Sequence, residues 1–274
     1  PGELFGLIGP DGAGKTTLFR VLTTLLLADE GSAQVAGFDL VNNYKDIRES
    51  VGYMPGRFSL YQDLTVEENL NFFATIFGTT IKENYDLIKD IYIQIEPFKN
   101  RRAGKLSGGM KQKLALCCAL IHKPKVLFLD EPTTGVDPVS RKEFWEMLKR
   151  LQQYGITILV STPYMDEAAL CDRIVLIQNG KILEIDTPAA IVKHFPKTIY
   201  NVAAHNMYQL LSSLKAYEHQ YSVYPFGEFV HYSDRRANFN SDDLKTYLET
   251  QNLSDIQINQ TQPTIEDTFM ELAK

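Results

Sequence analysis

A glycine-rich segment, residues 9–16, has the composition and spacing of a phosphate-binding loop: Gly, four residues, then Gly-Lys-Thr. The glycines allow backbone amides to turn toward phosphate oxygens, and the following helix adds its positive N-terminal end. Lys15 would neutralise phosphate charge, and the Thr16 hydroxyl would ligate Mg²⁺. The residues expected to contact the phosphates are Gly9, Pro10, Asp11, Gly12, Ala13, Gly14, Lys15, Thr16 and Thr17.

Two adjacent acids, Asp130 and Glu131, follow the apolar segment 126–129. A strand there would deliver both to the carboxyl edge of a parallel sheet, where open α/β folds bind ligands. Asp130 would hold Mg²⁺ through water, and Glu131 could polarise an attacking water as a general base. Taken singly, a glycine turn that binds nothing and two acids that solvate a strand end are both possible. Together the two elements favour phosphate chemistry, with Glu131 and Lys15 as the catalytic residues.

The segments that must position these residues alternate between strand and helix patterns. The predicted strands are residues 4–8, 51–54, 126–129 and 156–160, and the predicted helices are residues 14–27, 66–77, 85–95, 107–121 and 138–153. Apolar segments at 174–177 and 182–185 flank Asn179-Gly180, which predicts a hairpin with a type I′ turn. This alternation predicts an α/β fold with a mainly parallel central sheet.

Residues 196–274 are expected to form a small α+β domain. Their pattern predicts strands at 199–203 and 256–259, a hairpin of 222–224 with 229–232, and helices at 207–214, 242–249 and 264–272. This β-α-β-β-α-β order would suit a ferredoxin-like unit. The segment has no catalytic motif, and His205, His219 and His231 share no metal-ligand spacing. Regulation or stabilisation of a dimer is the expected role.

Composition excludes several other functions. The 274 residues suffice for one sizeable α/β domain with an appendage, and the formal net charge of −6, with scattered basic residues, argues against a nucleic-acid binder. No apolar run approaches the ~20 residues that span a bilayer. Cys117, Cys118 and Cys171 have neither metal-ligand spacing nor an even count, so reduced thiols in the cytoplasm are expected. The chain begins at Pro1 without Met or a signal peptide, which indicates a fragment.

A third motif identifies a family. Residues 106–112, Leu-Ser-Gly-Gly-Met-Lys-Gln, resemble the signature motif that separates ABC ATPases from other phosphate-loop enzymes. The resemblance covers residues 1–195 and implies a P-loop NTPase fold of ABC type with a helical subdomain at about 57–122. In that family two ATP-binding domains sandwich two ATP molecules, and Ser107, Gly108 and Gly109 would close over the nucleotide held by the partner domain. Residues 135–137, Gly-Val-Asp, resemble the loop that connects the two sites.

Two further segments resemble the multidrug (ABC-2-type) exporter branch: residues 53–55, Tyr-Met-Pro, and residues 264–269 near the end of the chain. This resemblance implies a Mg²⁺-dependent ATPase that powers an exporter through nucleotide-driven dimerisation. Its partners would be a second ABC ATP-binding domain and an integral membrane permease, with no nucleic acid. The chain would then sit at the cytoplasmic face of the inner or plasma membrane, held there by the permease.

The sequence departs from the family pattern at three places. Gly56 stands where a glutamine normally reaches Mg²⁺ and the attacking water, and Pro163 stands where a histidine contacts the γ-phosphate. The N-terminal strands that usually carry an adenine-stacking aromatic residue are not in the sequence. Gln62 could replace the missing glutamine, although an exposed loop residue is the simpler interpretation. Gly56 and Pro163 leave open a catalytically degenerate half that completes a partner's site. A soluble ABC ATPase without a permease is a separate alternative.

Overall fold

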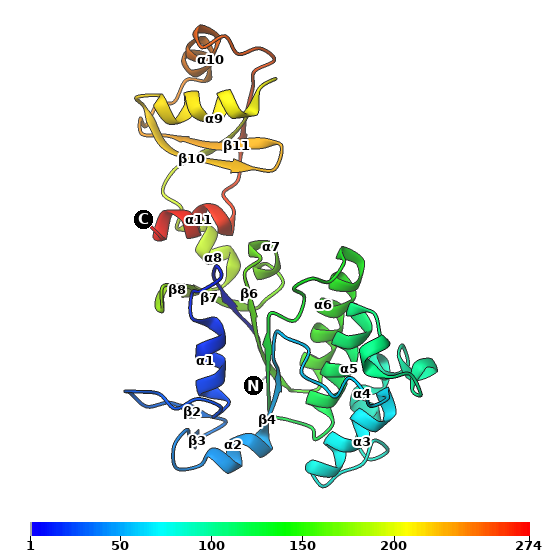
Figure 1. Cartoon of the computed structure of the whole chain (residues 1–274). Coiled ribbons are helices and arrows are strands. Elements are labelled where there is room, and N and C mark those ends of the chain that lie inside the picture. Colours follow the sequence, from blue (N-terminus) through cyan, green and yellow to red (C-terminus); the bar gives the residue numbers. More distant parts are fainter. Residues whose placement is uncertain (1) are drawn as a thin grey trace. The chain divides into compact units, whose positions relative to one another are not determined.

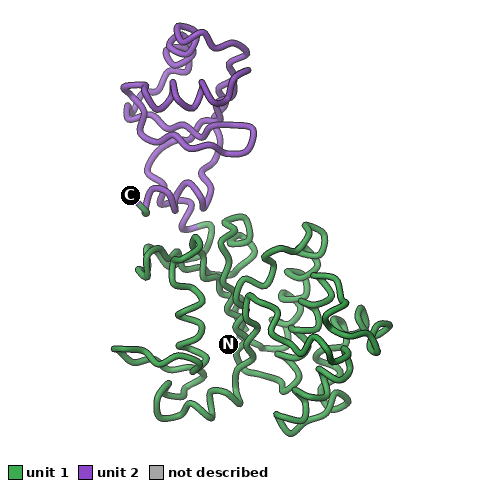
Figure 2. The backbone as a smooth tube through the Cα atoms, in the orientation of Figure 1, with its two compact units in different colours: residues 1–189, 273 green, residues 190–272, 274 purple. Residues whose placement is uncertain are grey.

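The computed structural model describes residues 2–274, which form two compact units (Figure 1). Figure 2 shows the units in separate colours: the first holds the described residues up to Ala189 together with Ala273, and the second holds Ala190–Leu272 together with Lys274. The division therefore falls slightly earlier along the chain than the expected one at 195/196. Across residues 2–274, no helix combines the length and apolar character needed to cross a membrane.

The first unit is built on a six-stranded sheet in the order β4-β5-β6-β1-β7-β8. All neighbouring strands are parallel except β7 and β8, which pair antiparallel. The predicted α/β fold with a mainly parallel sheet is confirmed. The strands are β1 (Leu4–Ile8), β4 (Val51–Met54), β5 (Val126–Asp130), β6 (Thr157–Thr162), β7 (Arg173–Gln178) and β8 (Lys181–Asp186).

Helices surround this sheet, and a separate two-stranded sheet of β2 (Gln34–Val35) with β3 (Phe38–Asp39) lies beside it. Phe19 packs edge-on against Phe128 with ring centroids 5.4 Å apart, which fixes the first helix on strand β5, next to the edge strand β4. The helices are α1 (Lys15–Leu22), α2 (Tyr44–Ser50), α3 (Val66–Ile76), α4 (Tyr85–Tyr92), α5 (Gly108–Leu120), α6 (Pro138–Gln153), α7 (Met165–Ala168) and α8 (Pro188–Lys193), with 3₁₀ turns at Glu96–Phe98 and Ala103–Lys105.

Helix α1 ends at Leu22, earlier than the predicted end at Leu27. Thr24 adopts a left-handed conformation with φ 60°, which reverses the chain. The Leu25 amide then donates to the Arg20 carbonyl at 2.7 Å, so the last carbonyls are satisfied as in a Schellman motif. The leucine-rich pattern continues to Leu27 although the helix has ended, because Leu25, Leu26 and Leu27 line a groove.

The predicted hairpin between β7 and β8 is confirmed. Asn179 and Gly180 both have positive φ, 51° and 73°, as a type I′ turn requires. Strand β8 forms the edge of the sheet next to β7.

The second unit has one four-stranded antiparallel sheet in the order β10-β11-β9-β12. Leu210 and Leu214 from one helix and Leu244 and Leu248 from another bury their side chains with Tyr232 on one face of this sheet. This is a split β-α-β arrangement with its own core. Its elements are β9 (Ile199–Ala203), α9 (Met207–Ala216), β10 (Gln220–Phe226), β11 (Phe229–Asp234), α10 (Ser241–Thr250), β12 (Gln257–Thr261) and α11 (Ile265–Leu272).

Candidate functional site

The glycine-rich loop joins β1 to α1, and its backbone requires glycine at several positions. An added Cβ at Gly9 would lie 2.2 Å from the carbonyl oxygen of Ile177, so only glycine fits there. Gly12 and Gly14 have φ of 78° and 103°, a region that favours glycine. Gly14 caps the N-terminus of α1 without a side-chain hydrogen bond. The amides of the first turn are therefore left for an anion.

The β7–β8 turn braces this loop. The Gly180 amide donates to the Ala13 carbonyl at 2.9 Å. Within the loop, the Ala13 amide donates to the Pro10 carbonyl at 3.2 Å. The loop is therefore held by a hairpin that follows it by more than 160 residues in the sequence.

Lys15 connects the loop to the end of β5. Its side chain is 3% exposed, and Nζ lies 3.1 Å from Oε1 of Glu131. The same ammonium donates to the carbonyls of Gly9 at 2.8 Å and Pro10 at 3.0 Å. Two segments far apart in sequence thus meet at one buried cation.

The two acids are fixed by Ser161 on the neighbouring strand β6. The Ser161 hydroxyl donates to Oδ1 of Asp130 at 2.6 Å. The Glu131 amide contacts the Ser161 carbonyl at 3.1 Å and its hydroxyl oxygen at 3.0 Å. Glu131 has φ 49°, an uncommon conformation for a residue other than glycine, and such strain concentrates at functional sites. Sequence reasoning did not single out Ser161, whose role depends on the register that places it opposite Asp130.

Gly56 lies directly against this acidic strand end. An added Cβ would lie 2.9 Å from the carbonyl oxygen of Asp130 and 3.7 Å from the Cβ of Glu131. Gln62 is exposed, and its side chain lies beside Gly104, within 3.6 Å of the position of a Cβ there. Its interpretation as an exposed loop residue agrees with this placement.

Ser107, Gly108 and Gly109 form a second group at the start of α5. The Ser107 hydroxyl caps the helix by accepting from the Met110 amide at 3.4 Å. An added Cβ at Gly108 would meet nothing within 4 Å, so the helix start is open there. At Gly109 it would lie 3.0 Å from the Ser140 hydroxyl of α6, which explains the second glycine.

The cysteines are not reactive in this structure. Burial raises the pKa of Cys171 to about 12 and also raises the pKa of Cys117 and Cys118. All three are buried and stay protonated. Among residues 2–274, no group of three or more His, Cys, Asp or Glu side chains is placed to hold a metal ion by itself.

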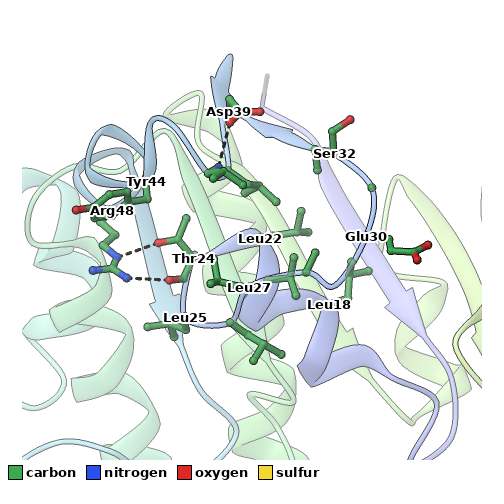
Figure 3. Close-up of a pocket in the computed structure, with 17 residues that line it drawn as sticks. Leu18, Leu22, Thr24, Leu25, Leu27, Glu30, Ser32, Asp39, Tyr44 and Arg48 are labelled. Carbon is green, nitrogen blue, oxygen red and sulfur yellow. Dashed lines mark hydrogen bonds between the residues drawn. The ribbon is translucent and has the colours of Figure 1, made fainter.

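Two apolar grooves lie away from the loop. One, of about 580 Å³, lies at the C-terminal end of α1 (Figure 3). There Arg48 donates twice to Thr24, each time at 2.8 Å, beside the exposed Leu25 and Leu27. The other, of about 460 Å³, lies between the segment around Pro55, α3 and α5.

Comparison with known proteins supports one interpretation of these features. Residues 1–134 match the family model described as "ABC transporter". The chain is 41% identical to "Probable multidrug ABC transporter ATP-binding protein YbhF" of Escherichia coli (strain K12), over 99% of this chain and 47% of that protein. It is 33% identical to "Nod factor export ATP-binding protein I" of Rhizobium sp. (strain N33), over 99% of this chain and 88% of that protein. The chain thus spans about half the length of the first of these relatives.

Solved structures show the same fold. "Structure of ATP binding subunit of ABC transporter" has a TM-score of 0.64 and 29% identity, over 71% of this chain and 82% of that one. "Dimeric Structure of MJ0796, a Bacterial ABC Transporter Cassette" has a TM-score of 0.61 and 24% identity, over 68% of this chain and 85% of that one. At that identity the second structure bears on the fold alone.

Proposed function

We propose that this chain, which belongs to the ABC transporter ATP-binding family, is the ATP-hydrolysing subunit or half-subunit that powers an exporter. The observation that carries the proposal is the convergence of Lys15, Asp130 and Glu131 at the carboxyl edge of the sheet. The relatives reported above are named for multidrug and Nod factor export, which supports an export role.

The phosphates of ATP would bind at the glycine-rich loop, facing the uncapped start of α1. Lys15 would turn from the Glu131 carboxylate to the β- and γ-phosphates. The Thr16 hydroxyl and the Asp130 carboxylate offer the hard oxygen ligands that Mg²⁺ prefers, and Ser161 orients the carboxylate. Bound Mg²⁺ would neutralise charge on the phosphate oxygens. These residues therefore suit ATP with Mg²⁺.

Glu131 is the general base in this proposal. Once Lys15 binds phosphate, the Glu131 carboxylate can accept a proton from the attacking water. Its backbone is already fixed by Ser161 and needs no rearrangement. The Glu131 amide donates to both the carbonyl and the hydroxyl oxygen of Ser161, which supports a fixed position for the start of the side chain.

A second ABC domain would complete the site. The open N-terminus of α5, with Ser107, Gly108 and Gly109, would face the nucleotide of that partner.

The groove of about 460 Å³ would take an amphipathic helix of a membrane permease, which supports placement at the cytoplasmic face of the membrane. Ile76 is 59% exposed beside it and offers an apolar contact. The residues expected to form the ATP-binding domain are 1–195, with the helical subdomain at about 57–122.

A catalytically degenerate half is the second candidate, and Gly56 and Pro163 favour it. Neither residue has a side chain that can donate a hydrogen bond, and Pro163 also lacks an amide hydrogen. Loss of one preorganised donor commonly lowers the rate by about 10²–10³. ATP binding would survive in this case, because Lys15, Thr16 and Asp130 remain.

Mg²⁺-dependent phosphate release by the full-length protein separates the two candidates. The test compares wild type with Glu131→Gln and with a matched control, Glu146→Gln, whose glutamate is exposed on α6. Turnover that survives Glu146→Gln and is lost in Glu131→Gln supports the active motor. ATP binding with no turnover above Glu131→Gln would instead support the degenerate half.

A further inference from the structure

Glu167 is a buried acid that the proposed mechanism does not use. It lies in the short helix α7, directly after the end of β6, and is 1% exposed. A carboxylate removed from water is strongly destabilising unless it is paired and hydrogen-bonded. The residues that pair with Glu167 therefore indicate which segments this buried carboxylate holds together.

Both carboxylate oxygens of Glu167 accept hydrogen bonds from hydroxyls on separate segments. Thr133 Oγ1 donates to Oε1 at 2.7 Å, and Thr162 Oγ1 donates to Oε2 at 2.6 Å. Arg141 Nε from α6 lies 3.6 Å from Oε1, so a positive charge accompanies the buried acid. One side chain thus joins α7, the end of β6, α6 and the segment after β5.

The two threonines lie beside the residues that fix Glu131. Thr133 follows Glu131 by two positions, and the adjacent Thr134 amide donates to the Glu131 carbonyl at 3.2 Å. Thr162 follows Ser161, whose carbonyl and hydroxyl oxygens contact the Glu131 amide. Glu167 therefore cross-links the two segments between which Glu131 is held.

This cross-link also fixes the turn that contains Pro163. The Tyr164 amide donates to Thr162 Oγ1 at 3.0 Å, and the Arg141 guanidinium lies over the Tyr164 ring, 4.3 Å from its centroid. The turn is thus held by Glu167 and Arg141 without a side-chain donor at position 163.

We propose that Glu167 is a positioning residue for Glu131: it ties the segment after β5 to the end of β6 and so holds the general base in its left-handed backbone conformation. The proposal rests on the proposed function for its catalytic meaning. A displacement of about 1 Å at a reacting group can lower the rate by about 10²-fold. Loss of the cross-link should therefore lower kcat more than it weakens ATP binding. Lys15 pairs with Gly9, Pro10 and Glu131. The loop reaches the cross-linked segment through the Gly9 amide, which donates to the Thr162 carbonyl at 3.3 Å, a backbone bond that does not use the Glu167 carboxylate.

The first measurement is steady-state ATP hydrolysis by Glu167→Gln, with Asp166→Asn, an exposed acid on the same helix, as the matched control. We expect kcat to fall by about 10- to 100-fold in Glu167→Gln, with KM changed less than about twofold. Asp166→Asn should match wild type. An unchanged kcat in Glu167→Gln, with only a lower Tm, would assign Glu167 a purely structural role and overturn the proposal.

A second pair of variants covers the case in which Glu167→Gln does not fold. Thr133→Val removes one hydroxyl that binds Glu167 with little change in volume, whereas Thr133→Ser keeps the hydroxyl. We expect Thr133→Val to lower kcat and Thr133→Ser to retain it. Equal kcat values for the two variants would contradict the cross-link.

Hydrogen exchange separates failure of this inference from failure of the proposed function. If wild type shows no turnover, the ATPase proposal fails, but the position of Glu131 can still be measured. In Thr133→Val and Glu167→Gln, the amides of Glu131 and Thr134 should exchange faster than in wild type, with the amides of β1 unchanged. Unchanged exchange at Glu131 and Thr134 in both variants would overturn the proposal, whatever the activity.

Discussion

Lys15 Nζ lies 3.1 Å from Glu131 Oε1, and the lysine side chain is only 3% exposed. The Glu131 side chain is 24% exposed, so water screens the pair in part, although less than it screens a pair on the surface. A phosphate at the loop would compete with Glu131 for the same ammonium. Under the proposed function, arrival of ATP therefore frees the general base, and the base is held back while the loop is empty.

Replacement of this lysine should weaken ATP binding. Hydrogen bonds to charged groups contribute about 1.5–3 kcal/mol, so Lys15→Ala should raise the Kd for ATP roughly 10- to 150-fold. Lys142→Ala removes an exposed lysine from α6 and should leave the Kd unchanged. Isothermal titration with ATP and Mg²⁺ measures both. Equal affinities for the two variants would place the phosphates elsewhere.

Restoring a glutamine at position 56 should harm the protein. Gly56→Gln puts a Cβ 2.9 Å from the Asp130 carbonyl oxygen, and a backbone atom must move to make room. Overpacking of this kind costs about 1–3 kcal/mol. Urea denaturation should show that loss, while Arg57→Gln, with the same new side chain at the next, exposed position, should stay close to wild type. A Gly56→Gln protein as stable as wild type, with faster turnover, would show that the strand end adapts readily.

The second unit should be sensitive to acid through Asp267. This carboxylate is 4% exposed and accepts hydrogen bonds from the Thr264 amide at 2.7 Å and hydroxyl at 2.6 Å, and it pairs with His231 at 2.8 Å. Burial alone would raise the pKa of Asp267, but the bonds to His231 and Thr264 lower it below its usual range. A lowered folded-state pKa adds stability above the unfolded pKa of about 3.9, and that stability is lost as pH falls through the folded pKa.

Asp267→Asn removes this titration. We expect the thermal midpoint of the variant to be lower than that of wild type at pH 7 and to approach it as pH falls below about 4. Thermal melts followed by circular dichroism at a series of pH values test this. Asp255→Asn, a change at an exposed acid of the same unit, is the control and should track wild type. Parallel curves for wild type and Asp267→Asn at all pH values would rule out the contribution.

The turn between β7 and β8 should require glycine at position 180, and it should accept glycine in place of Asn179. Gly180→Ala places a Cβ at φ 73°, which costs about 1–2 kcal/mol. Asn179→Gly at φ 51° should change stability by less than about 0.5 kcal/mol. Chemical denaturation of both variants measures the difference. A larger loss for Asn179→Gly than for Gly180→Ala would contradict the turn assignment.

Local sequence patterns predicted most of the strands and helices, because alternating short apolar runs and amphipathic segments are properties of neighbouring residues. Helix α6 was predicted at the residues where it occurs, with Pro138 at its start. The end of α1 was predicted too late in the chain, because it depends on the left-handed backbone of Thr24. Threonine rarely adopts this conformation. Arg48, which lies distant in sequence, donates to that residue.

The contacts of the candidate site were predicted only where one segment supplied them. The loop residues and the acidic pair were identified from spacing. Strand register brings Lys15 to Glu131 and Ser161 to both acids. One sequence by itself does not determine that register. The proposed role of Glu167 depends on Thr133 and Thr162, which come from two other segments. No sequence motif around Glu167 indicates it.

The hydrogen bond from the Gly180 amide to the Ala13 carbonyl has a consequence for ligand affinity. A glycine-rich loop that was free in solution would lose much backbone entropy on closing around an anion. Here the β7–β8 turn already holds the loop in the folded chain, so part of that entropy is lost on folding and not on binding. Under the proposed function, affinity for phosphate would then change with substitutions in the β7–β8 turn.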